Sequence, residues 1–457
     1  MVDLSDPAPA GTTAPLPGFN LPVPTAGIDD DERLARLRLA RSENVGPRTY
    51  QHLMARYGTA ILALAELPAL AGLGGRRGYV AYAEALALDE IRRGEAAGAR
   101  MVVMGEVGYP TRLGHIGSAP PVLWMRGDPA RLEGPATALV GARNASALGL
   151  RQARRLARGL ALSGEIVVSG LARGIDTAAH EGALAAMEGQ TSSPSLAVAY
   201  AATPSAGDGP PGQRAARTAS GAGDTGGGGV GSGGSMVRAA TADTGQTAAV
   251  MAGGIDVTYP QENAELAERI VDTGGVLVSE CAPGTVPSAR HFPRRNRLIS
   301  GLADGVVLVE AAIRSGSLIT ARTALDQGRE VMACPGAAED PRAGGCNALI
   351  RDGAGLVRDH RDVLEALSTI RARGLAEPEA SFLHSTAASA DAPNAALDDG
   401  ALAQRVFEVL GPSPVPIDAL CRLCNAPTSA MSLALVELEL AGRVLVMPGN
   451  EIAALPT

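Results

Sequence analysis

Basic side chains and one aromatic ring are concentrated in a short stretch of this 457-residue chain. Within eight residues it contains Arg290, Phe292, Arg294, Arg295 and Arg297. The apolar residues of the following LISGL segment require one side of the stretch to be buried, so we expect the arginines at helical spacing opposite them to project outward together. Guanidinium groups bind phosphate and an aromatic ring stacks on an unpaired base. The stretch therefore predicts a site for a polyanion that carries bases; the alternative is a solvated charged surface.

Three loops rich in glycine, serine and arginine each follow an apolar run and precede a helical pattern. They are GARNAS (141–146), SGLARGID (169–176) and SGS (315–317). Glycine lets the backbone approach a ligand, and free N–H groups at a helix start attract anions. Arg143 and Arg173 add positive charge, so we expect these loops to hold phosphates. A tight turn and an ordinary capped helix start remain the alternatives for the first and third loops.

Three ionisable residues near these loops have structural roles in our interpretation. Asp176 is placed to cap the start of the following helix. His180, one turn into that helix, is expected to be a buried, hydrogen-bonded residue. Glu310 ends the run GVVLVE and is expected to pair with an arginine of the basic stretch. None of these loops supplies a credible nucleophile, so the sequence predicts a binding protein and no catalytic residue.

The same sequence excludes several cofactor and metal sites. The chain contains no lysine, which rules out a P-loop of the G-x-x-x-x-G-K-[ST] type. GARNAS lacks the second and third glycines of the dinucleotide fingerprint. Cys421 and Cys424 have the spacing of half a zinc site, but no second pair lies nearby, so we assign them to core packing. We expect no metal and no cofactor.

The elements that position these loops are short apolar runs separated by helical stretches. IVVSG, VLVSE and VVLVE are continuously apolar and do not alternate, which is typical of strands buried on both faces of a parallel sheet. The predicted fold class is α/β: a Rossmann-like, doubly wound, mostly parallel sheet. Ligands of such sheets bind at the carboxyl ends of the strands, where the three loops lie.

Composition divides the chain into segments. We predict, in order, a disordered tail over 1–30, a helical module of the SAM or helix-hairpin-helix kind over 31–98, the Rossmann-like domain over 99–373 with a flexible glycine-rich insertion over 188–244, a linker over 374–400 and a winged helix over 401–457. Two interpretations of the helical module remain open. In one, a glycine turn presents backbone N–H groups to a phosphate; in the other, the module is a plain helical bundle. The expected recognition helix of the winged helix contains Glu437 and Glu439 and no arginine, so contact with protein is as reasonable there as contact with DNA.

Bulk properties limit the class of protein further. The net charge of −8 argues against a surface that is basic throughout, although a local basic patch is compatible with it. No apolar run approaches the roughly 18–20 residues that span a bilayer, and the first residues do not have the pattern of a secretory signal. Five cysteines, an odd number, fit a reducing cytosol without a disulfide framework. We expect a cytoplasmic protein without membrane contact.

Taken together, the motifs resemble those of the DNA-processing protein A family (DprA, also called Smf). In order, the chain contains GARNAS, SGLARGIDTAAH, GGIDVTYP, FPRRNRLISGL, SGSLITA and ACPG. The resemblance covers residues 99–360, and the terminal segments fit the family with less specific signals. Two departures are the insertion after Met187 and Cys334 in ACPG.

The resemblance implies a homodimeric Rossmann-like protein that binds single-stranded DNA, protects incoming strands during natural transformation and helps to load the RecA recombinase. The DNA-binding residues that it implies are Gly141, Arg143, Ser146, Ser169, Gly170, Arg173, Gly174, Phe292, Arg295, Asn296, Arg297, Ser315, Gly316 and Ser317. Arg294 fills a variable position of the motif and is added on its charge alone.

An enzyme acting on a nucleotide is the second hypothesis. Nucleoside monophosphate phosphoribohydrolases of the lysine-decarboxylase-like type share a Rossmann-like sheet and phosphate-binding loops. Their PGG-x-GT-x-x-E motif is missing here, because EAAIRSGSLITA has neither the PGG nor the catalytic glutamate.

Overall fold

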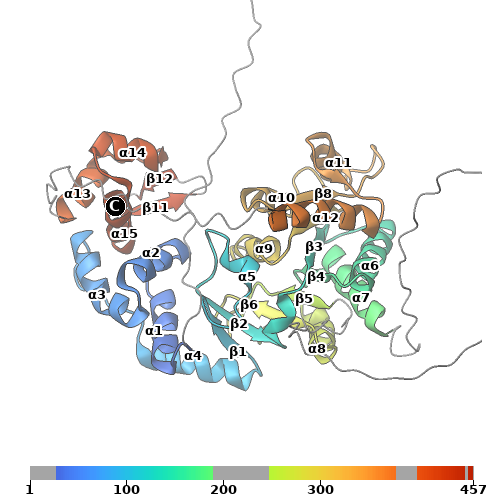
Figure 1. The fold of residues 1–457 in the computed structure, drawn as a ribbon, viewed down its shortest axis with the longest axis horizontal. Coiled ribbons are helices and arrows are strands. Elements are labelled where there is room, and N and C mark those ends of the chain that lie inside the picture. Colours follow the sequence, from blue (N-terminus) through green and yellow to red (C-terminus); the bar gives the residue numbers. More distant parts are fainter. Residues whose placement is uncertain (1–26, 189–245, 377–398, 448–450, 456–457) are drawn as a thin grey trace, which may run out of the picture.

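The computed structural model describes residues 27–188, 246–376, 399–447 and 451–455 (Figure 1). The predicted tail, the glycine-rich insertion, most of the predicted linker and the Pro448–Asn450 bend of the winged helix lie outside the described residues. The domain limits given above therefore stay predictions.

A nine-stranded sheet forms the centre of the molecule, in the order β1-β2-β6-β5-β4-β3-β7-β8-β9. In chain order the strands are β1 (Arg100–Val103), β2 (Val122–Arg126), β3 (Ala136–Gly141), β4 (Ile166–Ser169), β5 (Thr247–Val250), β6 (Val276–Ser279), β7 (Gly305–Val309), β8 (Glu330–Ala333) and β9 (Gly355–Leu356). All neighbours from β6 to β9 pair in parallel, and β1 and β2 add an antiparallel edge. The predicted doubly wound, mostly parallel sheet is confirmed.

Helices cover both faces of this sheet, which explains why its strands are apolar without alternation. One face packs on α5 (Thr111–Gly114), α9 (His291–Gly301), α10 (Ser317–Asp326) and α11 (Gly344–Arg351). The opposite face packs on α6 (Ala147–Leu162), α7 (Ile175–Glu188), α8 (Ala264–Asp272) and α12 (His360–Ala376). Two short 3₁₀ helices, η1 (Pro129–Leu132) and η2 (Gln261–Asn263), lie in the connections.

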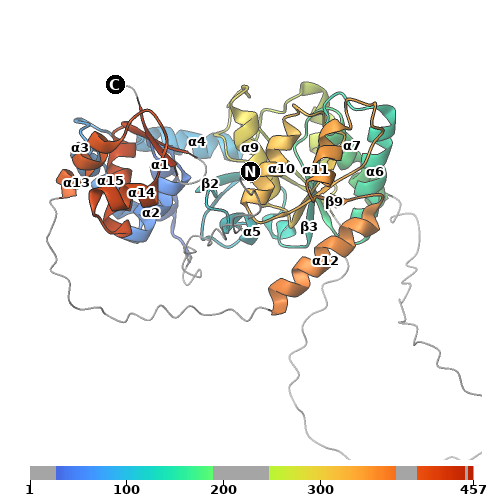
Figure 2. The same ribbon diagram turned by 90° about the horizontal axis from the view of Figure 1, so that it is seen from above.

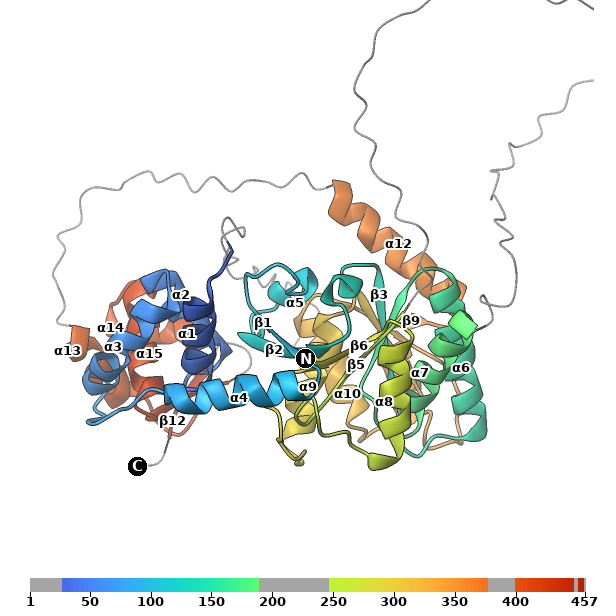
Figure 3. The same ribbon diagram turned by 90° about the horizontal axis from the view of Figure 1, so that it is seen from below.

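The N-terminal module contains α1 (Asp30–Arg41), α2 (Pro47–Tyr57), α3 (Ala60–Leu73) and α4 (Glu84–Ala96). Figure 3 shows α4 running beside the β1 edge of the sheet. There Arg41 and Glu90 form an ion pair of 2.8 Å, and the Trp124 indole donates to Glu90 at 3.0 Å. A charged carboxylate without exposed surface needs such partners, so this triad fixes the module to β2. The glycine turn that follows α3 begins only after Leu73.

The C-terminal domain contains α13 (Asp399–Val409), α14 (Ile417–Cys424) and α15 (Thr428–Leu440), with strands β10 (Val415–Pro416), β11 (Val444–Met447) and β12 (Glu451–Ala454). The strands form an antiparallel sheet in the order β10-β12-β11, so the predicted winged helix is confirmed. Cys424 is buried in the core of this domain, as predicted.

The winged helix packs against the N-terminal module through α15 (Figure 2). Val436 and Leu440 belong to the same buried cluster as Leu39 and Tyr50 of the module. This surface of α15 is therefore committed to contact with protein, which was one of the two roles considered for it.

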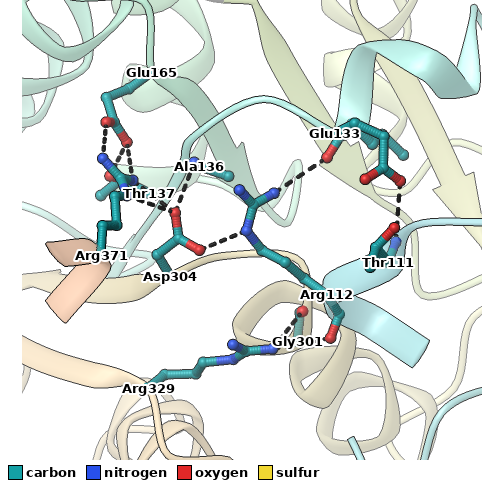
Figure 4. A network of polar contacts seen from close by, with 11 residues as sticks. Thr111, Arg112, Glu133, Ala136, Thr137, Glu165, Gly301, Asp304, Arg329 and Arg371 are labelled. Carbon is teal, nitrogen blue, oxygen red and sulfur yellow. Dashed lines mark hydrogen bonds and ion pairs between the residues drawn. The ribbon is translucent and has the colours of Figure 1, made fainter. Parts of the chain in front are cut away.

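A network of ion pairs lies at the amino ends of the parallel strands (Figure 4). Arg371 of α12 contacts both Glu165 and Asp304 at 2.6 Å, and Arg112 of α5 also pairs with Asp304. Burial alone would raise the pKa of Asp304, but the charges and hydrogen bonds of the two arginines lower it. The network holds α12 across the strands, at the edge opposite the three loops.

Among the described residues, no single helix is long and apolar enough to cross a membrane, and two bent helix pairs reach that length only when each pair is counted together.

Candidate nucleic-acid interface

The motifs identified in the sequence lie together at the carboxyl ends of the parallel strands. From β3 the chain adds β4, β5 and β6 on one side, and β7, β8 and β9 extend the sheet on the other. The order of the strands thus reverses between β3 and β7, and ligands of doubly wound sheets bind in the crevice at such a point. The loops after β3 and β7 lie at this point, and α9 reaches the neighbouring ends of β4 and β5 through Arg295.

An aromatic platform formed by Tyr259, Phe292 and Arg143 lies at this edge. The ring centroids of Tyr259 and Phe292 are 5.7 Å apart, with an interplanar angle of 59°. The Arg143 guanidinium lies over the Phe292 ring, 4.6 Å from its centroid. Arg143 is exposed, Phe292 is half-buried and Tyr259 is 55% exposed. The platform offers flat surfaces for bases beside a cation for a phosphate. Sequence reasoning missed Tyr259, although GGIDVTYP contains it.

Arg295, which the family resemblance implied to be a DNA-binding residue, points into the protein. It is 6% exposed, and its Nη1 donates to the carbonyl oxygens of Gly170 and Val250. A side chain at Gly170 would collide with the guanidinium, so this glycine makes room for Arg295. Burial lowers the pKa of Arg295 to about 10, against the opposing charge of Asp176. Arg295 supports the loops from beneath, and Asn296 accepts a hydrogen bond from its Nε.

Arg297 is also turned away from the surface. It pairs with Glu280 at 2.5 Å and donates to the carbonyl of Ser118, with both charged side chains about 15% exposed or less. Arg290 and Arg294 are exposed and form no ion pair among the residues that the structure describes. Of the predicted cluster, these two remain free to bind phosphate.

The loop after β4 combines internal and exposed residues. Ser169 has no exposed surface and its hydroxyl donates to the Leu139 carbonyl at 2.7 Å, so the predicted phosphate contact of Ser169 is not compatible with this arrangement. Gly174, with a φ of +79°, lies against the carbonyls of the loop after β3, where a Cβ would collide. Arg173 forms two hydrogen bonds with Glu262. Because both side chains are more than half exposed, this pair can open for a phosphate at little cost.

Asp176 and His180 lie beneath this loop on α7. Asp176 is the second residue of the helix and not its N-cap; its carboxylate accepts from the N–H groups of Ala172 and Gly170. Burial raises the pKa of Asp176, although Arg295 and these hydrogen bonds oppose the rise. The predicted structural role of His180 is confirmed. It is fully buried, its Nδ1 is 2.8 Å from the Thr247 hydroxyl, and burial, with the charge of Arg295, lowers its pKa to about 3.

The crevice between β3 and β7 contains the Glu310 carboxylate. It accepts from the N–H of Ser146 at 2.7 Å and from the Ser146 hydroxyl. Glu310 therefore binds Ser146. The expected pairing of Glu310 with an arginine of the basic stretch is wrong. The Ser146 oxygen also caps α6 by accepting from the N–H of Gly149 at 3.0 Å. The predicted phosphate position at the start of α6 is thus filled by a carboxylate of the chain itself, and Gly141 serves close packing against the Val309 carbonyl.

The loop after β7 ends at the start of α10. The hydroxyls of Ser315 and Ser317 are 2.7 Å apart, and the Ser317 N–H bonds to the Ser315 hydroxyl at 3.3 Å. Gly316 is exposed, and a Cβ there would meet open space. The two hydroxyls satisfy one another in this arrangement, next to the exposed Arg314. Among the described residues, no group of three or more His, Cys, Asp or Glu is placed to hold a metal.

Fold and site together define a Rossmann-like α/β protein with a cationic, partly aromatic surface at its carboxyl edge, flanked by a helical module and a winged helix. The chain belongs to the DNA recombination-mediator protein A family, whose model matches residues 100–199 and 225–368. The DprA-like N-terminal HHH domain matches residues 30–92, and the DprA winged helix domain matches residues 389–450. The resemblance found in the motifs is confirmed.

Relatives and a solved structure agree with this assignment. The chain is 33% identical to Protein Smf of Escherichia coli over 344 residues, which cover 75% of this chain and 74% of the relative. It is 35% identical to DNA processing protein DprA of Streptococcus pneumoniae over 256 residues, or 56% of this chain and 70% of the relative. The crystal structure of DNA processing protein A from Streptococcus pneumoniae matches with a TM-score of 0.50 and 28% identity, covering 72% of this chain and 95% of that one.

Proposed function

We propose that this protein binds single-stranded DNA along the carboxyl edge of its sheet. The observation that carries the proposal is the platform of Tyr259, Phe292 and Arg143. Stacking of a base on an aromatic side chain contributes roughly 1–3 kcal/mol and tolerates any sequence. In a duplex the faces of the bases are covered by their neighbours, so a platform of this kind selects unpaired strands.

In this proposal the backbone of the strand is held by exposed arginines. Arg143, Arg290, Arg294 and Arg314 are exposed at this edge, and none has an ion pair among the described residues. Arg173 is a further candidate once it leaves Glu262. Arg295 and Arg297 hold the loops in place and are not among the proposed phosphate contacts.

We further propose that the protein acts in recombination, protecting incoming strands and helping to load the RecA recombinase during natural transformation, as a homodimer. Membership of the DNA recombination-mediator protein A family supports this role. All five cysteines are free thiols, which supports a reducing compartment such as the cytosol. A pull-down of RecA with and without single-stranded DNA tests the partner. RecA retention equal to that of a control without the protein, both with and without single-stranded DNA, would refute the proposed partnership.

The proposal includes no catalysis. The Glu310 carboxylate occupies the start of α6, where the phosphate of a nucleotide would bind in a nucleotide-hydrolysing relative of this fold. His180 is fully buried, which disfavours a role in proton transfer to a ligand. Release of free base from nucleoside monophosphates would instead support the phosphoribohydrolase alternative.

A mobility-shift series with oligo-dT and with duplex DNA of equal length tests the main proposal. We expect tighter binding of oligo-dT, and binding weaker by about 5- to 150-fold for Phe292→Ala, because one stacked base is lost. Phe407→Ala on α13 of the winged helix removes another half-buried ring that lies beneath an arginine, Arg443, and serves as the matched control. Equal or tighter binding of the duplex would contradict the proposal.

A further inference from the structure

A cavity of about 240 Å³ lies between the N-terminal module and α9, beside the carboxyl ends of β5 and β6. The turn between α1 and α2 forms one wall through Val45, Gly46 and Pro47. The face of α9 that carries Arg294 and Leu298 forms the opposite wall. The cavity therefore exists only where two domains meet.

The groups that line the cavity are donors and apolar surfaces. Arg294 is exposed, and Arg295 lines the cavity with an Nη2 that has no hydrogen-bond partner in the described part of the chain. His291 accepts from the Ser288 N–H through Nδ1 at 3.2 Å, which leaves Nε2 for a ligand. The one carboxylate among the lining residues, Glu280, is neutralised by Arg297 at 2.5 Å. Such a wall suits a ligand that has flat apolar faces and carbonyl or phosphate oxygens.

The size of the cavity limits the size of the ligand that it can take. An apolar cavity of about 150 Å³ accommodates a benzene ring, whereas pockets for drug-sized ligands measure about 300–1,000 Å³. A cavity of about 240 Å³ lies between these values. It fits one aromatic ring with its substituents and is too small for a dinucleotide.

We propose that this cavity takes one unstacked base of the bound strand, with a preference for a pyrimidine. The inference rests on the proposed binding of single-stranded DNA. Phe292 of the platform and His291 of the cavity wall are neighbours on the first turn of α9, so a strand that stacks one base on Phe292 brings an adjacent base close to the cavity. The N-terminal module then completes a DNA site that the sheet domain begins.

Contacts between the domains hold the cavity in shape. Arg41 donates to the Glu280 carbonyl at 3.2 Å, and Arg93 donates to the Pro283 carbonyl at 2.6 Å. Both carbonyls belong to the loop after β6 that forms the rim. The module and the sheet domain are thus joined at the site itself.

The Cys281 thiol lines the cavity and provides a probe in the native protein. Cys334, Cys346 and Cys424 are buried, whereas Cys421 on α14 is partly exposed and distant in the fold, so it serves as an internal control. The rate of alkylation by N-ethylmaleimide is measured for both thiols by mass spectrometry, at about pH 8.5 because burial raises the pKa of Cys281. We expect saturating oligo-dT to slow alkylation of Cys281 at least tenfold and to leave Cys421 unchanged. An unchanged rate at Cys281 would overturn the inference.

A filled cavity gives the second measurement. Cys281→Phe places a ring in the space, and we expect oligo-dT to bind about tenfold more weakly, whereas Val286→Phe, at a 75% exposed position outside the lining, leaves affinity unchanged. Equal melting temperatures establish that both variants fold. Absence of any oligo-dT binding by the wild type overturns the proposed function and this inference together. Normal binding of oligo-dT by the wild type, with no protection of Cys281 or with no effect of Cys281→Phe, overturns the cavity alone.

Discussion

Neighbouring arginines on α9 have different tasks because each residue of an α-helix turns by about 100° around the helix axis. Arg294 faces solvent at the cavity, Arg295 enters the core beneath Gly170, and Arg297 reaches Glu280. A substitution in this cluster therefore affects either affinity or stability, depending on the direction in which the side chain points.

Arg297→Ala is expected to reduce stability. The substitution leaves Glu280 with its charge largely buried and unpaired, and breaking a buried pair costs about 3–5 kcal/mol; the remaining exposure of 13% and 15% places the cost at about 3 kcal/mol. Urea unfolding measures it, with Arg294→Ala as the surface control, for which we expect a change within about 0.5 kcal/mol. Addition of Glu280→Gln to Arg297→Ala is expected to restore part of the loss. Equal midpoints for the two single variants would contradict the assignment.

His180 is expected to make the protein sensitive to mild acid. Its pKa is about 3 in the folded state against an ordinary value of 6.5, so between these values the unfolded chain binds a proton that the folded protein does not. Stability therefore falls as the pH drops below 6.5, by about 2 kcal/mol at pH 5 from this residue. His180→Gln, compared with wild type by urea unfolding at pH 7 and pH 5, is expected to lose this part of the pH dependence. An equal loss of stability between pH 7 and pH 5 in the wild type and in His180→Gln would contradict this prediction.

At the scale of elements, α15 covers both turns of the N-terminal module. Asn44, in the first turn, donates to the Leu440 carbonyl at 3.2 Å, and Thr49 bonds to Glu439. Gly74, at the end of α3, lies against the Glu437 carbonyl without room for a Cβ. The glycine turn after α3, which could present N–H groups to phosphate, is thus covered by protein.

Gly74→Val is expected to separate α15 from the module, because its side chain would collide with the Glu437 backbone and Ala441. The φ of −71° suits any residue, so the effect comes from the collision and not from backbone strain. Hydrogen exchange is expected to increase in α15 and α2. The matched control is Gly72→Val, two residues earlier, where a Cβ has nothing within 4 Å. Equal exchange in the two variants would show that the contact is weaker than the packing indicates.

The sequence predicted elements better than the contacts between them. Continuous apolar runs such as VVLVE could belong only to strands covered on both faces, and the loops at their ends followed from the parallel order. The direction of Arg295 depends on the carbonyls of Gly170 and Val250, which are 125 and 45 residues away. The contact between Asn44 and Leu440 spans 396 residues. No local pattern encodes such partners, and for that reason Arg295 and Arg297 were placed among the DNA-binding residues.

At the scale of the molecule, DNA binding has to overcome the overall charge of −8. Many arginines are already neutralised by nearby carboxylates, including the network at the amino ends of the strands (Figure 4). Binding therefore depends on a few unpaired arginines at the carboxyl edge. The dependence of DNA affinity on salt concentration reports the number of these arginines, because each phosphate contact releases counterions.

Oligo-dT affinity is expected to fall with salt with a slope of log affinity against log salt near roughly −3, which corresponds to about four phosphate contacts. Arg294→Ala removes one contact and is expected to make the slope shallower by about 0.7. Arg422→Ala changes the net charge by the same amount on the winged helix, whose α15 is engaged with the N-terminal module, so it is expected to leave the slope unchanged. Fluorescence anisotropy between 50 and about 300 mM salt measures all three proteins. A shallower slope for Arg422→Ala would mean that the winged helix contacts the strand, and an unchanged slope for Arg294→Ala would remove α9 from the phosphate path.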